Sequence, residues 1–150
     1  MPTTRERVPS HTDETVNRRI RAGMARSVHY YGQHRDAIPR RLRELDEEWD
    51  IERAIQMNAA ALAFIGTTLG ATRGRGWLLL PALVTGFLFQ HAVQGWCPPI
   101  PILRRLGFRT ADEINTERYA LKALRGDFDA IADKSTPVGT ANAALKAVRG

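Results

Sequence analysis

Residues 54–96 read AIQMNAAALAFIGTTLGATRGRGWLLLPALVTGFLFQHAVQGW and contain no acidic side chain and only two basic ones, Arg73 and Arg75. The 18 residues 54–71 and the 21 residues 76–96 carry no formal charge, and the short segment TRGR lies between them. A helix that crosses a bilayer needs roughly 20 predominantly apolar residues. The stretch therefore predicts two antiparallel membrane-spanning helices joined by a tight loop, with the backbone hydrogen bonds satisfied inside each helix.

The charge of the chain lies on either side of this stretch. Residues 1–53 carry 11 basic and 10 acidic side chains, and residues 97–150 carry 9 basic and 6 acidic ones. The net charge of +6 suits either nucleic acid or an anionic lipid surface. The first residues, MPTTRERVPSHTDE, lack the apolar segment of a cleavable signal peptide. We therefore expect the chain to enter a membrane through its interior.

The expected fold is all-α, a two-helix transmembrane hairpin flanked by amphipathic cytoplasmic helices. Residues 1–53 are predicted to form a polar tail and two amphipathic helices, residues 54–110 the hairpin with a proline-rich exit, and residues 111–150 a C-terminal amphipathic helix and a loose tail. Apolar side chains recur at helical steps in each flanking segment. They are Val16, Ile20, Met24, Val28 and Tyr31 in the first, Ile38, Leu42, Leu45 and Trp49 in the second, and Ile114, Leu121, Leu124, Phe128 and Ile131 in the third.

The sequence also predicts helix caps and an ion pair in these flanking helices. Thr12 and Asp36 are predicted to cap the first and the second helix. Glu117 is expected to pair with Arg118 or Lys122 on its own helix. The arginine-rich first helix has two interpretations that the pattern leaves open, a solvated helix packed on its neighbours and a helix that lies on anionic headgroups.

Small side chains recur at four-residue steps in the predicted hairpin, and GTTLG at residues 66–70 matches the GxxxG pattern. Membrane helices associate by close packing, which small residues permit. We therefore predict a helix interface, either within the hairpin or with another copy of the chain or another membrane protein. The predicted packing positions are Ala59, Ala63, Gly66, Gly70, Ala82 and Gly86.

The exit from the second span reads GWCPPIPILRRLGFRT. Trp96 is expected at the membrane–water boundary, where indole rings are enriched. Cys97 and Pro98 follow it, and the prolines are expected to end the helix because proline lacks an N–H and clashes with the preceding turn. Arg104 and Arg105 are expected to contact lipid phosphates at the cytoplasmic leaflet.

This exit resembles the terminal signature of the YgaP-like transmembrane domain family, in which the second helix runs into Cys-Pro and the domain closes on Leu-Gly-x-x-Thr. The matching residues are Cys97, Pro98 and the segment LGFRT at residues 106–110. The segment IERAIQMNAAALAFIG at residues 51–66 is similar to the family's first-helix opening. The resemblance covers about residues 51–110 and implies a small two-helix hairpin of the bacterial inner membrane. It implies a location and an architecture, and no reaction.

The arginines that flank the hairpin favour one orientation. The twenty residues before Ala54 hold five arginines, the twenty after Trp96 hold three, and the loop holds two. Because basic residues accumulate on the cytoplasmic side of membrane helices, both termini are expected in the cytoplasm. Trp49 lies just before the charge-free zone and is either a core residue or a second boundary indole.

Most motifs of catalysis and binding are missing from the sequence. It has no P-loop, no dinucleotide fingerprint and no defensible metal-ligand spacing among its four histidines. We expect no cofactor, metal or catalytic residue, and a scaffold or partner-binding role in the membrane. One alternative is a membrane-linked sulfur or redox protein that uses Cys97. Another is a soluble, basic helical binding module, although the basic residues are scattered among acids, so nucleic acid is not an expected partner.

Overall fold

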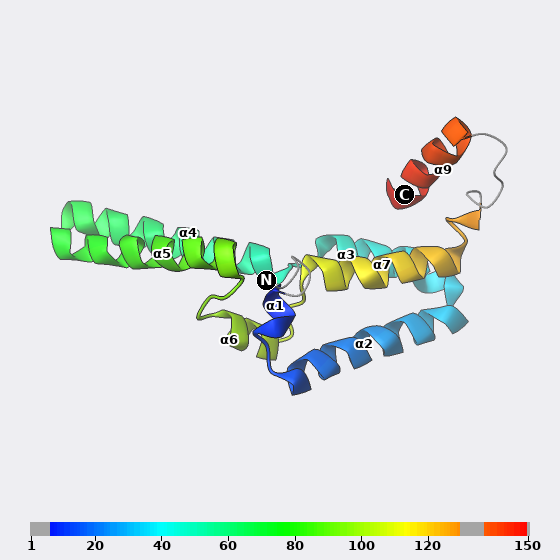
Figure 1. Ribbon diagram of the computed structural model, residues 1–150, viewed down its shortest axis with the longest axis horizontal. Helices are drawn as coiled ribbons and strands as arrows, with labels where there is room; N and C mark the ends of the chain where they lie inside the picture. The colour runs from blue at the N-terminus through cyan, green and yellow to red at the C-terminus, as the bar shows by residue number, and fades with distance from the viewer. Residues whose placement is uncertain (1–6, 130–136, 150) are drawn as a thin grey trace. The chain divides into compact units, whose positions relative to one another are not determined.

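A computed structural model describes residues 7–129 and 137–149, and in these ranges every regular element is helical (Figure 1). The expected all-α fold is thus confirmed. The chain divides into two compact units. We name them the hairpin unit, Met1–Ile20 with Trp49–Ala111, and the bundle unit, Arg21–Glu48 with Asp112–Gly150. Each unit combines segments from both sides of residue 49, which differs from the three sequential parts expected.

The hairpin unit contains two long helices and several short elements. Its regular elements are α1 (Arg7–Ser10), the first turns of α2 (Glu14–Gln33), α4 (Ile51–Thr72), the 3-10 turn η2 (Arg75–Leu78), α5 (Leu79–Gln94) and α6 (Ile100–Arg105). The carboxylate of Asp50 caps α4 by accepting a hydrogen bond of 2.7 Å from the Arg53 amide. Between α4 and η2, Gly74 adopts a φ of 151°, which a side chain would disfavour.

The bundle unit is built from the rest of α2, the 3-10 turn η1 (Arg35–Ala37), α3 (Ile38–Glu47), α7 (Ala111–Arg125) and α9 (Pro137–Arg149). Its core joins the predicted apolar faces of α3 and α7. The buried members are Ile38, Leu42, Leu45, Ile114 and Leu121, with Tyr31 and Leu124 packed against them. Trp49, expected on the same face, lies beyond the end of α3 and is 41% exposed. Ile131 falls outside the described residues.

Two predicted helix caps and the loose C-terminal tail need correction. Asp13, and not Thr12, accepts hydrogen bonds from the hydroxyl and the amide of Thr15, which lower the pKa of the Asp13 carboxyl below its ordinary value. Asp36 lies within η1, and the residue that precedes α3 is Ala37, which makes no side-chain cap. The predicted loose tail forms α9 instead, and Ala147 is buried.

A buried carboxylate lies inside the bundle unit. Glu117 on α7 is 1% exposed, and its Oε1 accepts hydrogen bonds from Ser27 Oγ at 2.5 Å and from Arg41 Nε at 3.0 Å. Both of these partners lie on other helices, Ser27 on α2 and Arg41 on α3. The Arg118 guanidinium reaches Asp46 on α3 at 2.8 Å, and Lys122 Nζ donates to the Val148 carbonyl at 2.8 Å. These polar side chains therefore bind one helix to another.

Candidate functional site: the apolar hairpin

The helices α4 and α5 leave most of their apolar side chains uncovered. Helix α4, and the 20-residue segment Arg75–Gln94 formed by η2 and α5, are long and apolar enough to cross a membrane, and their residues are hardly buried within the protein. Phe64 is 73% exposed, Leu79 is 68% exposed and Phe89 is 74% exposed. Large contiguous apolar surfaces are uncommon on soluble proteins and mark places that contact a partner or lipid. The hairpin is therefore unlike the buried core helices of a soluble fold.

Several polar side chains along the hairpin, three threonines and one asparagine, form hydrogen bonds to their own helices. The hydroxyl of Thr67 donates to the carbonyl of Ala63, that of Thr68 to Phe64, and that of Thr85 to Pro81, at 2.7–2.8 Å. The side-chain amide of Asn58 donates to the Ala54 carbonyl at 3.0 Å. Such bonds to the preceding turn let a polar residue stay in an apolar medium without a water partner.

The two helices touch closely near the tip of the hairpin. Gly66 is buried, and a Cβ added there would lie 2.6 Å from Cδ of Pro81 and 3.1 Å from Cβ of Leu80. A Cβ at Gly70 would lie 2.5 Å from Cδ2 of Leu78. Both glycines of the GTTLG segment thus contact the second arm of their own hairpin, where small residues let the backbones approach.

The other predicted packing positions differ in their surroundings. Ala59 and Ala63 on α4 are half-buried, whereas Ala82 and Gly86 on α5 are exposed. No atom lies within 4 Å of a Cβ placed on Gly86. Next to Gly66, the α5 residues that meet α4 are the larger Leu80 and Pro81. The small strip on α5 therefore does not serve the contact within the hairpin.

Replacing Gly66 with leucine is expected to lower the free energy of unfolding by about 1–3 kcal/mol, a range typical of overpacked interiors. The proline ring at position 81 cannot rotate away, so α4 and α5 must separate. The matched control is Gly86→Leu, which meets no neighbour and should leave the stability nearly unchanged. Chemical unfolding in detergent micelles measures both. Equal losses for the two variants would contradict the assigned contact.

The end of α5 differs from the sequence-based expectation. The helix ends at Gln94 because Gly95 takes a left-handed conformation with φ 76°, and the Gly95 amide donates a hydrogen bond to the His91 carbonyl. The prolines that follow do not break the second span. Pro99 instead precedes the short helix α6 and Pro101 occupies its first turn, where the missing N–H costs no hydrogen bond.

Helix α6 packs across the base of the hairpin. Ile100 and Leu103 join Ile51 and Ile55 of α4 in a buried cluster. Cys97 belongs to the same cluster, Trp96 is half-buried, and Pro98 is exposed. Of the residues expected at the membrane exit, then, only some are on the surface. Val8 and Ala54 are also buried in this cluster, and Leu88 and Phe108 pack against it.

Arg104 corrects the expectation that both exit arginines contact lipid headgroups. It is 1% exposed, because it shares the inward face of α6 with Ile100 and Leu103. Its Nη2 donates to Oδ1 of Asn17 at 2.9 Å, and its Nη1 donates to the Phe108 carbonyl at 3.3 Å. Arg105 is exposed and remains available to a phosphate.

The environment of Cys97 disfavours thiolate chemistry. The side chain is buried, and burial raises the pKa of the thiol above its ordinary value. A nucleophilic cysteine needs the opposite shift, produced by nearby positive charge. Within residues 7–129 and 137–149, no group of three His, Cys, Asp or Glu side chains is placed to hold a metal ion.

Asn17 is a buried polar residue that the sequence pattern did not single out. Its amide nitrogen donates to the carbonyl of Pro9 at 2.9 Å while its oxygen accepts from Arg104. At the base of α4, the Arg53 guanidinium lies 4.3 Å from the centroid of the Trp49 ring.

Comparison of the chain with protein-family models, with curated proteins and with solved structures finds no match.

Proposed function

We propose that this chain is a small integral membrane protein without enzymatic activity, whose α4–α5 hairpin is embedded in the bilayer of the bacterial inner membrane. It acts there as a scaffold or as a hairpin that binds a membrane partner. The observation that carries the proposal is the uncovered apolar surface of both long helices. In water this surface would be costly, since burial of apolar area is worth roughly 25 cal/mol per Å².

The ends of the hairpin support an orientation with both termini in the cytoplasm. Because α4 and α5 are joined by a short turn, their outer ends emerge on the same side of a membrane. Arg73 and Arg75 are the two charges of the tip, and more arginines flank the other end. The bias of basic residues towards the cytoplasm favours that end as the cytoplasmic one.

Two further features support the family and partner parts of the proposal. The Cys97–Pro98 and LGFRT signature favours a YgaP-like hairpin. The exposed small residues Ala82 and Gly86 leave room for a second membrane helix, from another copy or from another protein. Cross-linking in native membranes, followed by identification of the neighbours, separates these two partners.

Membrane fractionation tests the proposal. The chain is expected to resist alkaline carbonate washing and to be released only by detergent. Recovery in the soluble fraction would reject the proposal.

Topology is tested in a Cys97→Ser background with one new cysteine, either Gly76→Cys at the tip or Glu47→Cys on the exposed surface of α3. A membrane-impermeant maleimide added to spheroplasts should label the first and spare the second, and the reverse pattern would invert the orientation.

A further inference from the structure

The hairpin unit contains an apolar cavity of about 450 Å³ between α4, α5 and α6. Its walls include Leu62 of α4, Phe87 and Leu88 of α5, and Ile102 and Leu103 of α6. The size is within the range of roughly 300–1,000 Å³ that is usual for small-molecule sites. The cavity is therefore large enough for a ligand and is made by three separate elements.

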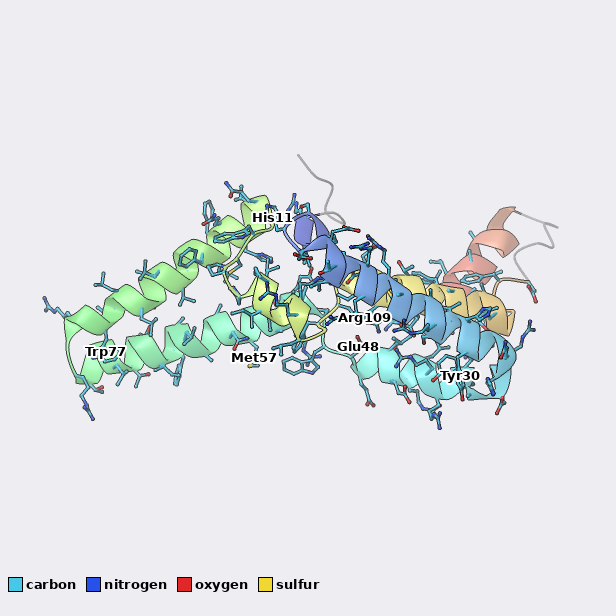
Figure 2. The ribbon with its side chains drawn as sticks, turned by 90° about the horizontal axis from the view of Figure 1, so that it is seen from below. His11, Tyr30, Glu48, Met57, Trp77 and Arg109 are labelled. Atoms are coloured by element: carbon cyan, nitrogen blue, oxygen red, sulfur yellow. The ribbon has the colours of Figure 1, made fainter. Side chains whose placement is uncertain are left out.

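The cavity exists because the two long helices diverge. They meet closely at Gly66 near the tip and spread apart from the turn at Trp77 towards their other ends (Figure 2). At the open end, α6 packs against α4 through Ile100 and Leu103. This packing closes the base of the gap and leaves the space above it between the diverging helices.

The walls of the cavity consist almost entirely of hydrocarbon side chains. Among the described residues of the wall, only Asn58 has a polar side-chain group besides the thiol of Cys97, and the Asn58 amide donates to the Ala54 carbonyl. An ordered water needs two to four polar partners, and this wall offers few. Leu62, Phe87 and Ile102 line the cavity and are also 45%, 40% and 64% exposed. The cavity is thus continuous with the outer apolar surface of the hairpin.

We propose that this cavity binds one acyl chain of a membrane phospholipid. The inference rests on the proposed function, because only a bilayer brings acyl chains to the outer surface of α4 and α5. The chain enters beside α6 and runs between the helices towards the tip. Arg105 is exposed on α6, three residues after the cavity residue Ile102. A phospholipid that enters there brings its phosphate to α6, the helix that carries this arginine.

Retention of lipid by the purified full-length chain tests the proposal. The protein is extracted in mild detergent, washed with excess detergent and assayed by native mass spectrometry for bound phospholipid. The wild type is expected to retain one phospholipid per chain. Ala59→Phe fills the cavity and should reduce the retained lipid several-fold. The matched control is Ala60→Phe on the exposed surface of the same helix, which should retain lipid like the wild type.

A second pair of variants and a second measurement guard against misfolding of Ala59→Phe. Ile102→Trp fills the cavity from α6, and Leu106→Trp changes an exposed residue outside it. Cys97 lines the cavity, so its reaction with N-ethylmaleimide reports occupancy. Added phosphatidylglycerol should slow this reaction in the wild type and in Leu106→Trp. It should have little effect on Ile102→Trp, because the tryptophan fills the cavity and slows the reaction of Cys97 even without lipid.

The outcomes distinguish this proposal from the one on which it rests. A wild-type chain that does not integrate into membranes overturns the proposed function. A chain that integrates, yet loses all phospholipid on washing and shows the same maleimide rate with and without lipid, overturns the acyl-chain site alone. Retention that Ala59→Phe and Ile102→Trp leave unchanged also overturns it, since the lipid is then bound elsewhere.

Discussion

Replacing Glu117 with alanine is expected to lower the free energy of unfolding of the bundle unit by about 3–5 kcal/mol, the usual cost of removing one partner from a buried ion pair. The carboxylate is 1% exposed and accepts from both Ser27 and Arg41. Without it, the partly covered guanidinium of Arg41, 23% exposed, loses its buried counter-charge. Ser27 loses an acceptor as well, and the alanine leaves a void in the packed interior.

The matched control is Glu44→Ala. Glu44 binds the same guanidinium, with 3.2 Å between its Oε2 and Arg41 Nη1, but its side chain is 48% exposed. Exposed pairs contribute about 0–1 kcal/mol, so the control should unfold almost like the wild type. Urea unfolding of the full chain in detergent, with hydrogen exchange of the amides of α3 and α7, measures the two losses. If both variants lose the same stability, the burial of Glu117 does not account for the contribution of the Glu117–Arg41 pair to the free energy of unfolding.

Glu117→Gln separates charge from shape. Glutamine keeps the volume and a carbonyl oxygen that can accept from Ser27, but it carries no negative charge for Arg41. We therefore expect a loss of stability between those of the alanine variant and the wild type. An unfolding curve of Glu117→Gln that coincides with that of Glu117→Ala would mean that the charge alone accounts for the effect.

The long helices were predictable because their signal accumulates over many residues. The cleared charge of residues 54–71 and 76–96 anticipates α4 and α5, although α4 begins earlier, at Ile51, and η2 precedes α5. The apolar faces of α3 and α7 were predictable for the same reason, since each repeats over two or more turns. What such a pattern does not contain is the identity of the surface that each face covers.

Short elements and tertiary ion pairs were not predictable. Helix α6 has six residues and lies among prolines, which were interpreted as terminators although proline also suits a first turn. One and a half turns are too few to show which face is buried, so Arg104 looked like an exposed neighbour of Arg105. Glu117 has basic residues nearby in sequence, and nothing local indicates that its partner is Arg41, 76 positions away.

The position of Gly66 was predictable as a packing site, but its partner was not. The GxxxG spacing indicates a close helix contact without saying which helix provides it. The structure places Pro81 and Leu80 of the same hairpin there. On α5 the small residues at the same spacing are exposed, because the contact depends on the rotation of each helix about its axis, which spacing alone does not determine.

Replacing Arg104 with methionine is expected to destabilise the base of the hairpin unit, whereas Arg105→Met is not. Arg104 is enclosed and donates to Asn17 and to the Phe108 carbonyl, and Asn17 in turn donates to the Pro9 carbonyl. Each buried acceptor left without its donor costs about 1–3 kcal/mol, and more where the lost donor is charged. Methionine preserves the length of the side chain, so the loss measures the polar contacts more than the packing.

Hydrogen exchange localises the effect of Arg104→Met. Amides of α6 and of residues 8–17 should exchange faster in this variant, because the arginine connects α6 to the start of α2. Arg105→Met, at the adjacent exposed position, should change stability by no more than about 0.5 kcal/mol while weakening adhesion to vesicles that contain phosphatidylglycerol. If Arg104→Met unfolds no more readily than Arg105→Met and weakens vesicle adhesion to the same degree, Arg104 contacts headgroups after all, and the base of the hairpin must be held together by its apolar cluster alone.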